Sequence, residues 1–534
     1  MYKRILKLFY LFAAASLSGI LLSLAFPRPD LGWLGWVALA PLLISALSAN
    51  AVSAFFVSLF FGVVFFTGVF SWIFDVPGYQ FLHHVLLGLY FGPLMGLFGW
   101  IINRISRRWN AVAALAASPL IWVSIEYIRS NLSFLALPWA LLGHSQYQYP
   151  LIIQFASFTG AYGISFLMAF ANAAVAATIL AYCPRLAGDL PIKISPPSKQ
   201  AAICMSLAVV VSIGAAMTYG YAIVSQPLEG PTIKTSVLQG NIDQTMKADP
   251  KKYAKFIMEK YTDLTRKALK DQPELIVWPE AATPGFVLKS MSLYQQITSL
   301  VKEANTYFLI GSSEYPKFAK PSSPTPKDIG NTALFFAPDG KVIGQYLKIH
   351  LVPFGESVPY SGFIPWPGFI VPENKHNYEV PGKELTLFHI GDAAFGVLIC
   401  WEVVFPELFR SFVKKGANFM INATNEGWFG KTAAPYQMVA INVFRAVENR
   451  IAVARAANTG ISCFIDPYGR ITGRVKNHDQ DIFVAGYLTQ RIPLSHQKTF
   501  YTVYGDIFVY AVLVLTVLLI GALFFDIKFS GRIN

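Results

Sequence analysis

The chain has few charged residues. Only 14% of its 534 residues are Asp, Glu, Lys or Arg, whereas 54% are hydrophobic. A typical soluble domain carries roughly 25% charged residues, so this composition excludes an ordinary soluble protein and indicates that much of the chain lies in lipid. The charged residues that are present gather between about Pro231 and Pro493, which separates a polar region from the apolar remainder.

Cysteine is also scarce, with four in the whole chain. Cys183 and Cys204 lie near or within apolar stretches, whereas Cys400 and Cys463 lie in the polar region. A pair of cysteines in an exported domain is a candidate disulfide. Because Cys400 and Cys463 each follow an apolar run, we interpret them as positions on separate strands and favour free thiols.

Eight apolar stretches are each near the roughly 20 residues that a helix needs to cross a bilayer. They cover about residues 6–26, 31–47, 52–74, 81–102, 111–128, 151–181, 201–223 and 504–525. The first could be a cleaved signal peptide, but it is long, no clean small-residue cleavage site follows it, and another stretch begins almost at once. We therefore predict an α-helical membrane bundle of eight spans, with the polar region inserted between spans seven and eight.

This organisation predicts three parts. Residues 1–229 form the membrane domain, residues 230–494 form the inserted domain, and residues 495–534 form a return segment and the eighth span. About 260 residues in the inserted domain are enough to bury a hydrophobic core.

Basic residues in the short loops predict the orientation of the spans. The basic residues that fall together on one side of the predicted membrane are Lys3, Arg4, Lys7, Arg104, Arg107, Arg108, Arg185, Lys193, Lys199, Lys528 and Arg532. Since such residues favour the cytoplasmic side, both termini are expected in the cytoplasm and the polar domain outside it. The net charge of +13 is then partly a topology signal, and nucleic acid is not an expected partner.

Short β-type runs alternate with helical stretches in the polar region, which predicts a layered α/β fold. The predicted strands cover residues 235–238, 275–278, 307–311, 332–337, 394–400, 419–423, 452–456 and 462–465, and the predicted helices cover residues 253–270 and 293–304. Pro338-Asp339-Gly340 indicates a hairpin turn, because proline presets φ and glycine accepts a positive φ.

Three polar residues follow or close predicted strands: Glu280, Lys348 and Cys400. Together they suffice for one chemistry, in which the carboxylate takes the thiol proton, the thiolate attacks a carbonyl carbon, and the ammonium stabilises the oxyanion and lowers the thiol pKa. Each residue alone has a plainer explanation. Exposed Glu and Lys side chains are usually solvated surface groups, and a free Cys usually packs as a small hydrophobe.

Three motifs, in this order, resemble those of the nitrilase superfamily. They are Trp278-Pro279-Glu280, Lys348 with the run Val352-Pro353-Phe354-Gly355-Glu356 after it, and Ile399-Cys400-Trp401-Glu402. Members of that superfamily carry a Glu-Lys-Cys triad on a four-layer α-β-β-α sandwich. A nitrilase-like domain between the seventh and eighth of eight spans further resembles the apolipoprotein N-acyltransferase family of bacterial envelopes, and this resemblance covers essentially the whole chain.

The resemblance implies a two-step acyl transfer at the bacterial inner membrane, with the catalytic domain in the periplasm. Cys400 would attack the sn-1 ester of a phospholipid, and the resulting thioester would acylate the N-terminal amine of a diacylglyceryl-cysteine lipoprotein. The implied partners are this phospholipid donor, this lipoprotein acceptor and the surrounding membrane lipids. The resemblance implies no cofactor and no metal, and the expected state is a monomer.

The same motifs suggest supporting residues. Glu356 is a second acid near the lysine, and Glu402 is expected to hydrogen-bond the neighbouring loop or to orient Lys348. Asn331 matches a polar position of the family. Trp401 stands where the family has tyrosine, so aromatic bulk is retained but the hydroxyl is absent.

Trp428 belongs to the stretch Asn422–Gly430, which resembles the family's segment beside the active site. It lines an acyl groove or acts as a lid in one interpretation. In the other it is simple core packing.

Two other functions remain open. A membrane-tethered nitrilase-like hydrolase would use the same three residues and differ only in giving the acyl group to water. A transporter with an outer ligand-binding domain is the second, but the predicted spans hold few ionisable residues of the kind that mark substrate sites in membranes. His83 and His84 are exceptions, although histidines near the outer end of a span more often face the interface.

Overall fold

The computed structural model describes residues 2–132, 134, 136–183, 195–315, 329–371 and 379–524. The chain divides into two compact units. One, here called the helical unit, comprises Met1–Phe74, Gly78–Ser225 and Tyr504–Asn534; the other, here called the α/β unit, comprises Asp75–Pro77 and Gln226–Val503. The basic residues Arg185, Lys193, Lys528 and Arg532, on which part of the predicted orientation depends, lie outside the described residues.

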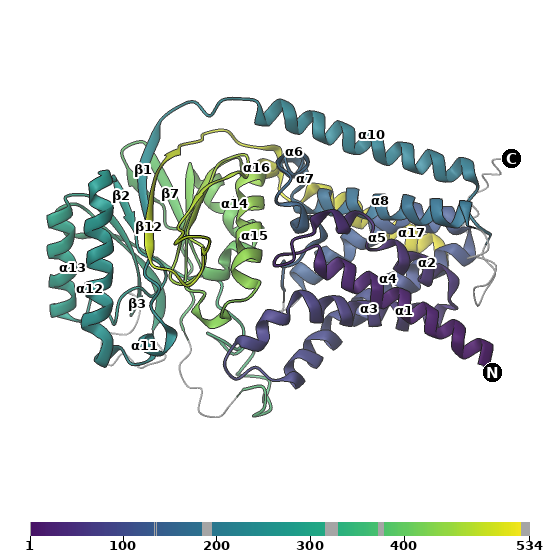
Figure 1. The fold of residues 1–534 in the computed structure, drawn as a ribbon, viewed down its shortest axis with the longest axis horizontal. Helices are drawn as coiled ribbons and strands as arrows, with labels where there is room; N and C mark the ends of the chain where they lie inside the picture. Colours follow the sequence, from purple (N-terminus) through teal and green to yellow (C-terminus); the bar gives the residue numbers. More distant parts are fainter. Residues whose placement is uncertain are drawn as a thin grey trace. The chain divides into compact units, whose positions relative to one another are not determined.

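Seven helices of the helical unit are long and apolar enough to cross a membrane, and they run roughly along one direction in Figure 1. They are α1 (Tyr2–Leu24), α3 (Ala51–Val69), α4 (Phe81–Arg108), α5 (Ala111–Asn131), α8 (Ala161–Tyr182), α10 (Lys199–Val224) and α17 (Ile507–Phe524). Shorter helical segments connect them: η1 (Gly32–Trp36), α2 (Ala40–Ser48), η2 (Ser71–Asp75), η4 (Leu142–Gln146), α6 (Pro150–Ile153) and α7 (Ala156–Thr159). This count applies to the described part of the chain.

The stretch predicted as the second span is not one long helix. It consists of η1 followed by α2, which has 9 residues. At about 1.5 Å per residue, α2 is less than half the length needed to cross a hydrocarbon core of about 30 Å. The predicted count of eight spans therefore stays a prediction, and so do the predicted domain limits.

The α/β unit contains two six-stranded sheets. The first has the order β12-β1-β2-β3-β4-β5, and its strands are β12 (Gly486–Pro493), β1 (Thr232–Gln239), β2 (Leu275–Val277), β3 (Tyr307–Glu314), β4 (Gly330–Phe336) and β5 (Val342–Leu347). The second has the order β11-β10-β9-β8-β7-β6, and its strands are β11 (Ile471–Arg474), β10 (Cys463–Ile465), β9 (Ala452–Ala457), β8 (Phe419–Thr424), β7 (Ala393–Ile399) and β6 (Phe388–Ile390). The predicted α/β fold is confirmed.

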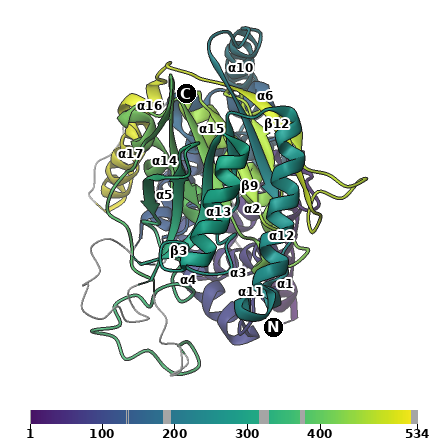
Figure 2. The same cartoon turned by 90° about the vertical axis from the view of Figure 1, so that its left-hand side faces the viewer.

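Each sheet has three parallel strands at its centre. In the first, α12 (Pro250–Ala268) connects β1 to β2 and α13 (Met291–Ala304) connects β2 to β3; in the second, α14 (Pro406–Lys415) connects β7 to β8 and α15 (Ala434–Asn449) connects β8 to β9. Parallel neighbours require such crossover connections. As Figure 1 shows, α12 and α13 cover one outer side of the paired sheets, and α14 and α15 cover the other. Figure 2 shows α12 and α13 in front, which completes an α-β-β-α order.

Buried aromatic residues hold these layers together. Phe335 on β4 meets Phe395 on β7 edge to face, with ring centroids 5.5 Å apart, so the two sheets share one core. Between the first sheet and its helices, Trp278 is fully buried and stacks on Tyr261 of α12. Large aromatic side chains contribute most to such cores, and Trp278 thereby fixes the exit of β2.

Candidate active site

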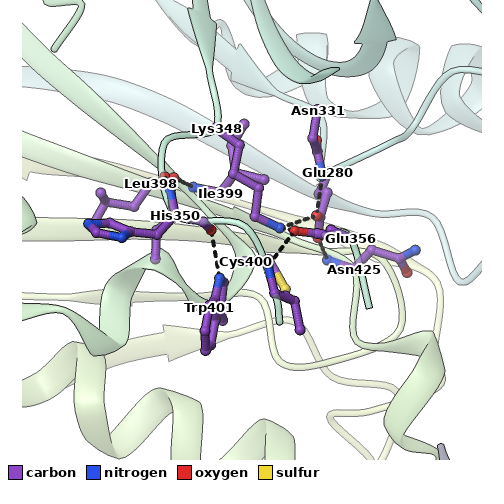
Figure 3. Close-up of polar contacts among 12 residues, drawn as sticks. Glu280, Asn331, Lys348, His350, Glu356, Leu398, Ile399, Cys400, Trp401 and Asn425 are labelled. Carbon is purple, nitrogen blue, oxygen red and sulfur yellow. Dashed lines mark hydrogen bonds and ion pairs between the residues drawn. The ribbon is translucent and has the colours of Figure 1, made fainter. Parts of the chain in front are cut away.

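Glu280 lies just beyond the end of β2, in a buried position. Trp278 anchors the segment because its indole N–H donates to the Thr265 hydroxyl at 3.1 Å. The Glu280 carboxylate accepts a hydrogen bond from the Asn331 side-chain amide and another from the Asn425 backbone N–H, both at 2.6 Å (Figure 3). Each oxygen is thus held by a donor, which fixes the carboxylate in one orientation.

Lys348 follows β5, and its side chain is completely buried. Its Nζ lies 2.5 Å from Glu356 Oε1 and 3.5 Å from Glu280 Oε1. Burial by itself lowers the pKa of Lys348, but the Glu356 and Glu280 carboxylates outweigh burial and hold that pKa well above its ordinary value. The side chain is therefore an ammonium that can stabilise an oxyanion.

Cys400 is the first residue of η7 (Cys400–Val404), immediately after β7. Its φ is +56°, a left-handed conformation that is uncommon for a residue other than glycine. The Asn422 side-chain amide donates to the Cys400 carbonyl oxygen at 3.1 Å and so supports the turn. Figure 3 shows the thiol beside the Lys348 ammonium and the Glu280 carboxylate.

The surroundings of the Cys400 thiol favour its protonated form. Burial raises its pKa, the Glu280 carboxylate raises it further, and the opposing effect of Lys348 is smaller. The expectation that the lysine lowers the thiol pKa is confirmed for the lysine's own effect, but burial of Cys400 and the Glu280 carboxylate raise that pKa by more. A thiol in this state needs a base that removes its proton as it attacks.

Glu402 joins the segment that carries Lys348 to the segment that carries Cys400. Its carboxylate accepts from the backbone N–H groups of Ile349 at 2.7 Å and His350 at 3.0 Å, and from that of Ile399 at 2.7 Å. The Tyr346 hydroxyl also donates to it at 3.0 Å. Glu402 therefore hydrogen-bonds the backbone on both sides of the site, as expected for the neighbouring loop.

Replacing Glu402 with glutamine should lower the free energy of unfolding by about 2–3 kcal/mol, because the new amide nitrogen would face a backbone N–H donor in a buried place. Thermal unfolding of the purified protein measures this. Tyr346→Phe is the matched control, since it removes one donor to the same carboxylate, at a cost of about 1 kcal/mol. Equal melting temperatures for wild type and Glu402→Gln would contradict the role of Glu402.

The two tryptophans have different environments. The Trp401 indole N–H donates to the His350 carbonyl oxygen at 2.7 Å, and its ring meets Phe405 edge to face. A hydrogen-bonding group is thus present at Trp401 although the tyrosine hydroxyl of the family is absent. Trp428, in η8 (Gly427–Phe429), is 47% exposed, so it is not core packing.

The structure adds two residues that the sequence did not single out. Lys247 in α11 (Gln244–Ala248) donates to the Ala281 carbonyl oxygen at 2.9 Å, directly after Glu280. Glu379 lies near Lys348 and Glu356. Neither residue belongs to a periodic or motif pattern, so only the folded chain reveals them.

Cys183, Cys204, Cys400 and Cys463 are all free, as predicted for the pair in the polar region. Within the described ranges, no group of three or more His, Cys, Asp or Glu side chains is arranged to hold a metal ion.

Two known protein families match the chain. The family described as carbon-nitrogen hydrolase matches residues 234–490, and the apolipoprotein N-acyltransferase N-terminal domain matches residues 18–174. The apolipoprotein N-acyltransferase of Geobacter metallireducens is 34% identical over 506 residues, which cover 93% of this chain and 92% of that protein. That of Chlorobaculum tepidum is 27% identical and covers 92% of both chains.

Solved structures match the chain less closely. A mutant of an amidase of the nitrilase superfamily from Nesterenkonia is 18% identical, with a TM-score of 0.37. The match covers 50% of this chain and 92% of the amidase.

Proposed function

The chain belongs to the apolipoprotein N-acyltransferase family, and we propose that it moves an acyl chain from the sn-1 position of a phospholipid to a lipoprotein through a thioester on Cys400. The acceptor is the N-terminal amine of a diacylglyceryl-cysteine. The observation that carries the mechanism is the buried cluster of one thiol, one ammonium and one firmly held carboxylate at Cys400, Lys348 and Glu280.

In the first step, Glu280 takes the thiol proton of Cys400 while the sulfur attacks the ester carbonyl carbon. The negative charge that develops on the carbonyl oxygen is stabilised by Lys348. When the bond to the glycerol oxygen breaks, that oxygen receives the proton from Glu280. The products are a lysophospholipid and an acyl thioester, and the Glu280 carboxylate is restored.

In the second step, the acceptor amine attacks the thioester carbonyl carbon and gives a proton to Glu280. The carbon–sulfur bond then breaks, and the sulfur of Cys400 recovers that proton. The amide product and the free enzyme result. Cys400 is 7% exposed, which supports transfer rather than hydrolysis, because exclusion of water protects a reactive thioester.

We further propose the setting of this reaction. The basic residues of the short loops support a bacterial inner-membrane protein of eight spans whose catalytic domain, residues 230–494, is periplasmic. Both substrates carry acyl chains anchored in the membrane, so a catalytic domain tethered by spans meets them without their leaving the bilayer. A monomer contains every residue that the two steps require.

Phospholipid without an acceptor tests the proposal. Purified full-length enzyme should become acylated on Cys400 and stall, and an amine-bearing diacylglyceryl lipopeptide should then discharge it. Intact-protein mass spectrometry follows both events. Full transfer with Cys400 never acylated would refute the covalent route, and acyl chains lost to water alone would identify a hydrolase.

A further inference from the structure

We propose that Glu379 is a further carboxyl group of this site and carries a proton in the resting enzyme. It is a positioning residue, since it acts through Lys348, Glu356 and Glu280 rather than on the substrate. The inference rests on the proposed function only in that the acylation of Cys400 is its readout.

The backbone from Glu379 to Gly382 is hydrogen-bonded to the two segments that carry Lys348 and Glu356. The Glu379 N–H donates to the Glu356 carbonyl oxygen at 2.9 Å, and the Gly382 N–H donates to the Lys348 carbonyl oxygen at 2.7 Å. Gly382 packs so closely on Leu347 that a Cβ would overlap the carbonyl oxygen of Leu347. These backbone contacts with Glu356, Lys348 and Leu347 determine where Glu379 lies.

The side chain of Glu379 has too few donors for an ionised carboxylate. The Asn331 backbone N–H donates to it, but Oε2 is shielded from solvent and has no hydrogen-bond partner among the described residues. The side-chain oxygen of Asn331 is likewise buried without a donor. A buried carboxylate oxygen without a donor is costly, whereas a proton on Oε2 removes the negative charge that would need one.

The charges around Glu379 favour the same state. The charged groups that face it are Glu356, Lys348 and Glu280, so two other carboxyl groups and one ammonium act on Glu379. Lys348 already lies 2.5 Å from Glu356 and 3.5 Å from Glu280. Burial first, and the Glu356 carboxylate second, raise the pKa of Glu379 to about 8.

Protonation of Glu379 leaves the ammonium of Lys348 balanced by Glu356 and lets Glu280 act as the base. Above pH 8 the proton leaves Glu379, and a further negative charge appears beside Lys348. That charge opposes formation of the thiolate and of the oxyanion. The wild-type rate of Cys400 acylation should therefore be reduced at high pH relative to a variant that cannot ionise at this position.

The test compares wild type with Glu379→Gln, an isostere of the protonated acid, in single-turnover acylation of the full-length protein by phospholipid. Glu384→Gln is the matched control, because Glu384 is exposed and five positions away. At pH 7 the acylation rates of wild type and Glu379→Gln should agree within about twofold. From pH 7 to pH 9 the ratio of the Glu379→Gln rate to the wild-type rate should rise about tenfold, while the Glu384→Gln ratio stays flat.

A flat ratio for Glu379→Gln would overturn the inference, and so would a folded Glu379→Gln that is inactive at every pH, since that result makes Glu379 an ionised base. Glu379→Leu, which also cannot ionise, must give the same rise if glutamine perturbs folding. Absence of any thioester in wild type would instead refute the proposed function, which separates the two failures.

Discussion

A Cys400→Ala variant should take up no acyl chain from phospholipid and transfer none to a lipopeptide amine. The thioester needs the sulfur of Cys400, which Figure 3 shows beside Lys348 and Glu280. The loss should be complete rather than partial, because the residual groups of the site stabilise an oxyanion but supply no nucleophile. Intact mass after incubation with phospholipid, and gel mobility of the lipopeptide, measure the two steps.

Cys463→Ala is the matched control for this variant. Cys463 is also buried and free, and it lies on β10 of the second sheet. Both substitutions remove one buried sulfur atom and should cost about 1 kcal/mol of stability each. A normal acylation rate for Cys463→Ala, beside none for Cys400→Ala, assigns the loss to chemistry. N-acylated lipopeptide made by Cys400→Ala would contradict the mechanism.

Replacing Glu280 with glutamine should slow acylation of Cys400 by about 10²–10⁴-fold, the usual contribution of a positioned general base. The effect is large because the resting thiol keeps its proton and cannot attack without giving it up. Since hydroxide can replace the missing base, the rate of Glu280→Gln should rise with pH more steeply than that of wild type. Rapid-quench sampling at several pH values measures both effects.

Glu314→Gln separates the loss of a base from the disturbance of a buried carboxylate. Glu314, at the end of β3, is buried and accepts hydrogen bonds from the Val287 backbone N–H and the Ser312 hydroxyl. Its substitution should lower the melting temperature as much as Glu280→Gln does, yet leave acylation within about twofold of wild type. Equal acylation rates for the two variants would argue against Glu280 as the base.

Continuous apolar runs are the clearest signal of a strand in the sequence. β2, β7 and β8 are buried on both faces, so each reads as an uninterrupted hydrophobic segment. β11 and β12 lie at sheet edges and are mostly half-buried, so they show no such run and were missed. α15 was missed for the opposite reason, because it is buried all round and lacks the polar face that reveals a helix.

The site residues likewise divide into those that a local sequence motif reveals and those that only contacts between distant segments reveal. Glu280, Lys348 and Cys400 belong to motifs, so their types and order were visible in the chain. The Asn425 N–H that holds Glu280 and the burial that raises the pKa of Cys400 arise only when distant segments meet. Glu379 has no motif at all, since its position depends on backbone bonds to Glu356 and on the neighbouring Gly382 bond to Lys348.

The carboxylate of Glu402 is bonded to the end of β5 in one sheet and to the end of β7 in the other. An enzyme that alternates between two substrates must present the same atoms twice in each cycle, first to an ester and then to an amine. Because the Glu402 carboxylate links the two sheets, Lys348 and Cys400 keep the same relative positions for both substrates. The lysophospholipid can then leave and the lipoprotein can bind without a change in the positions of Lys348 and Cys400.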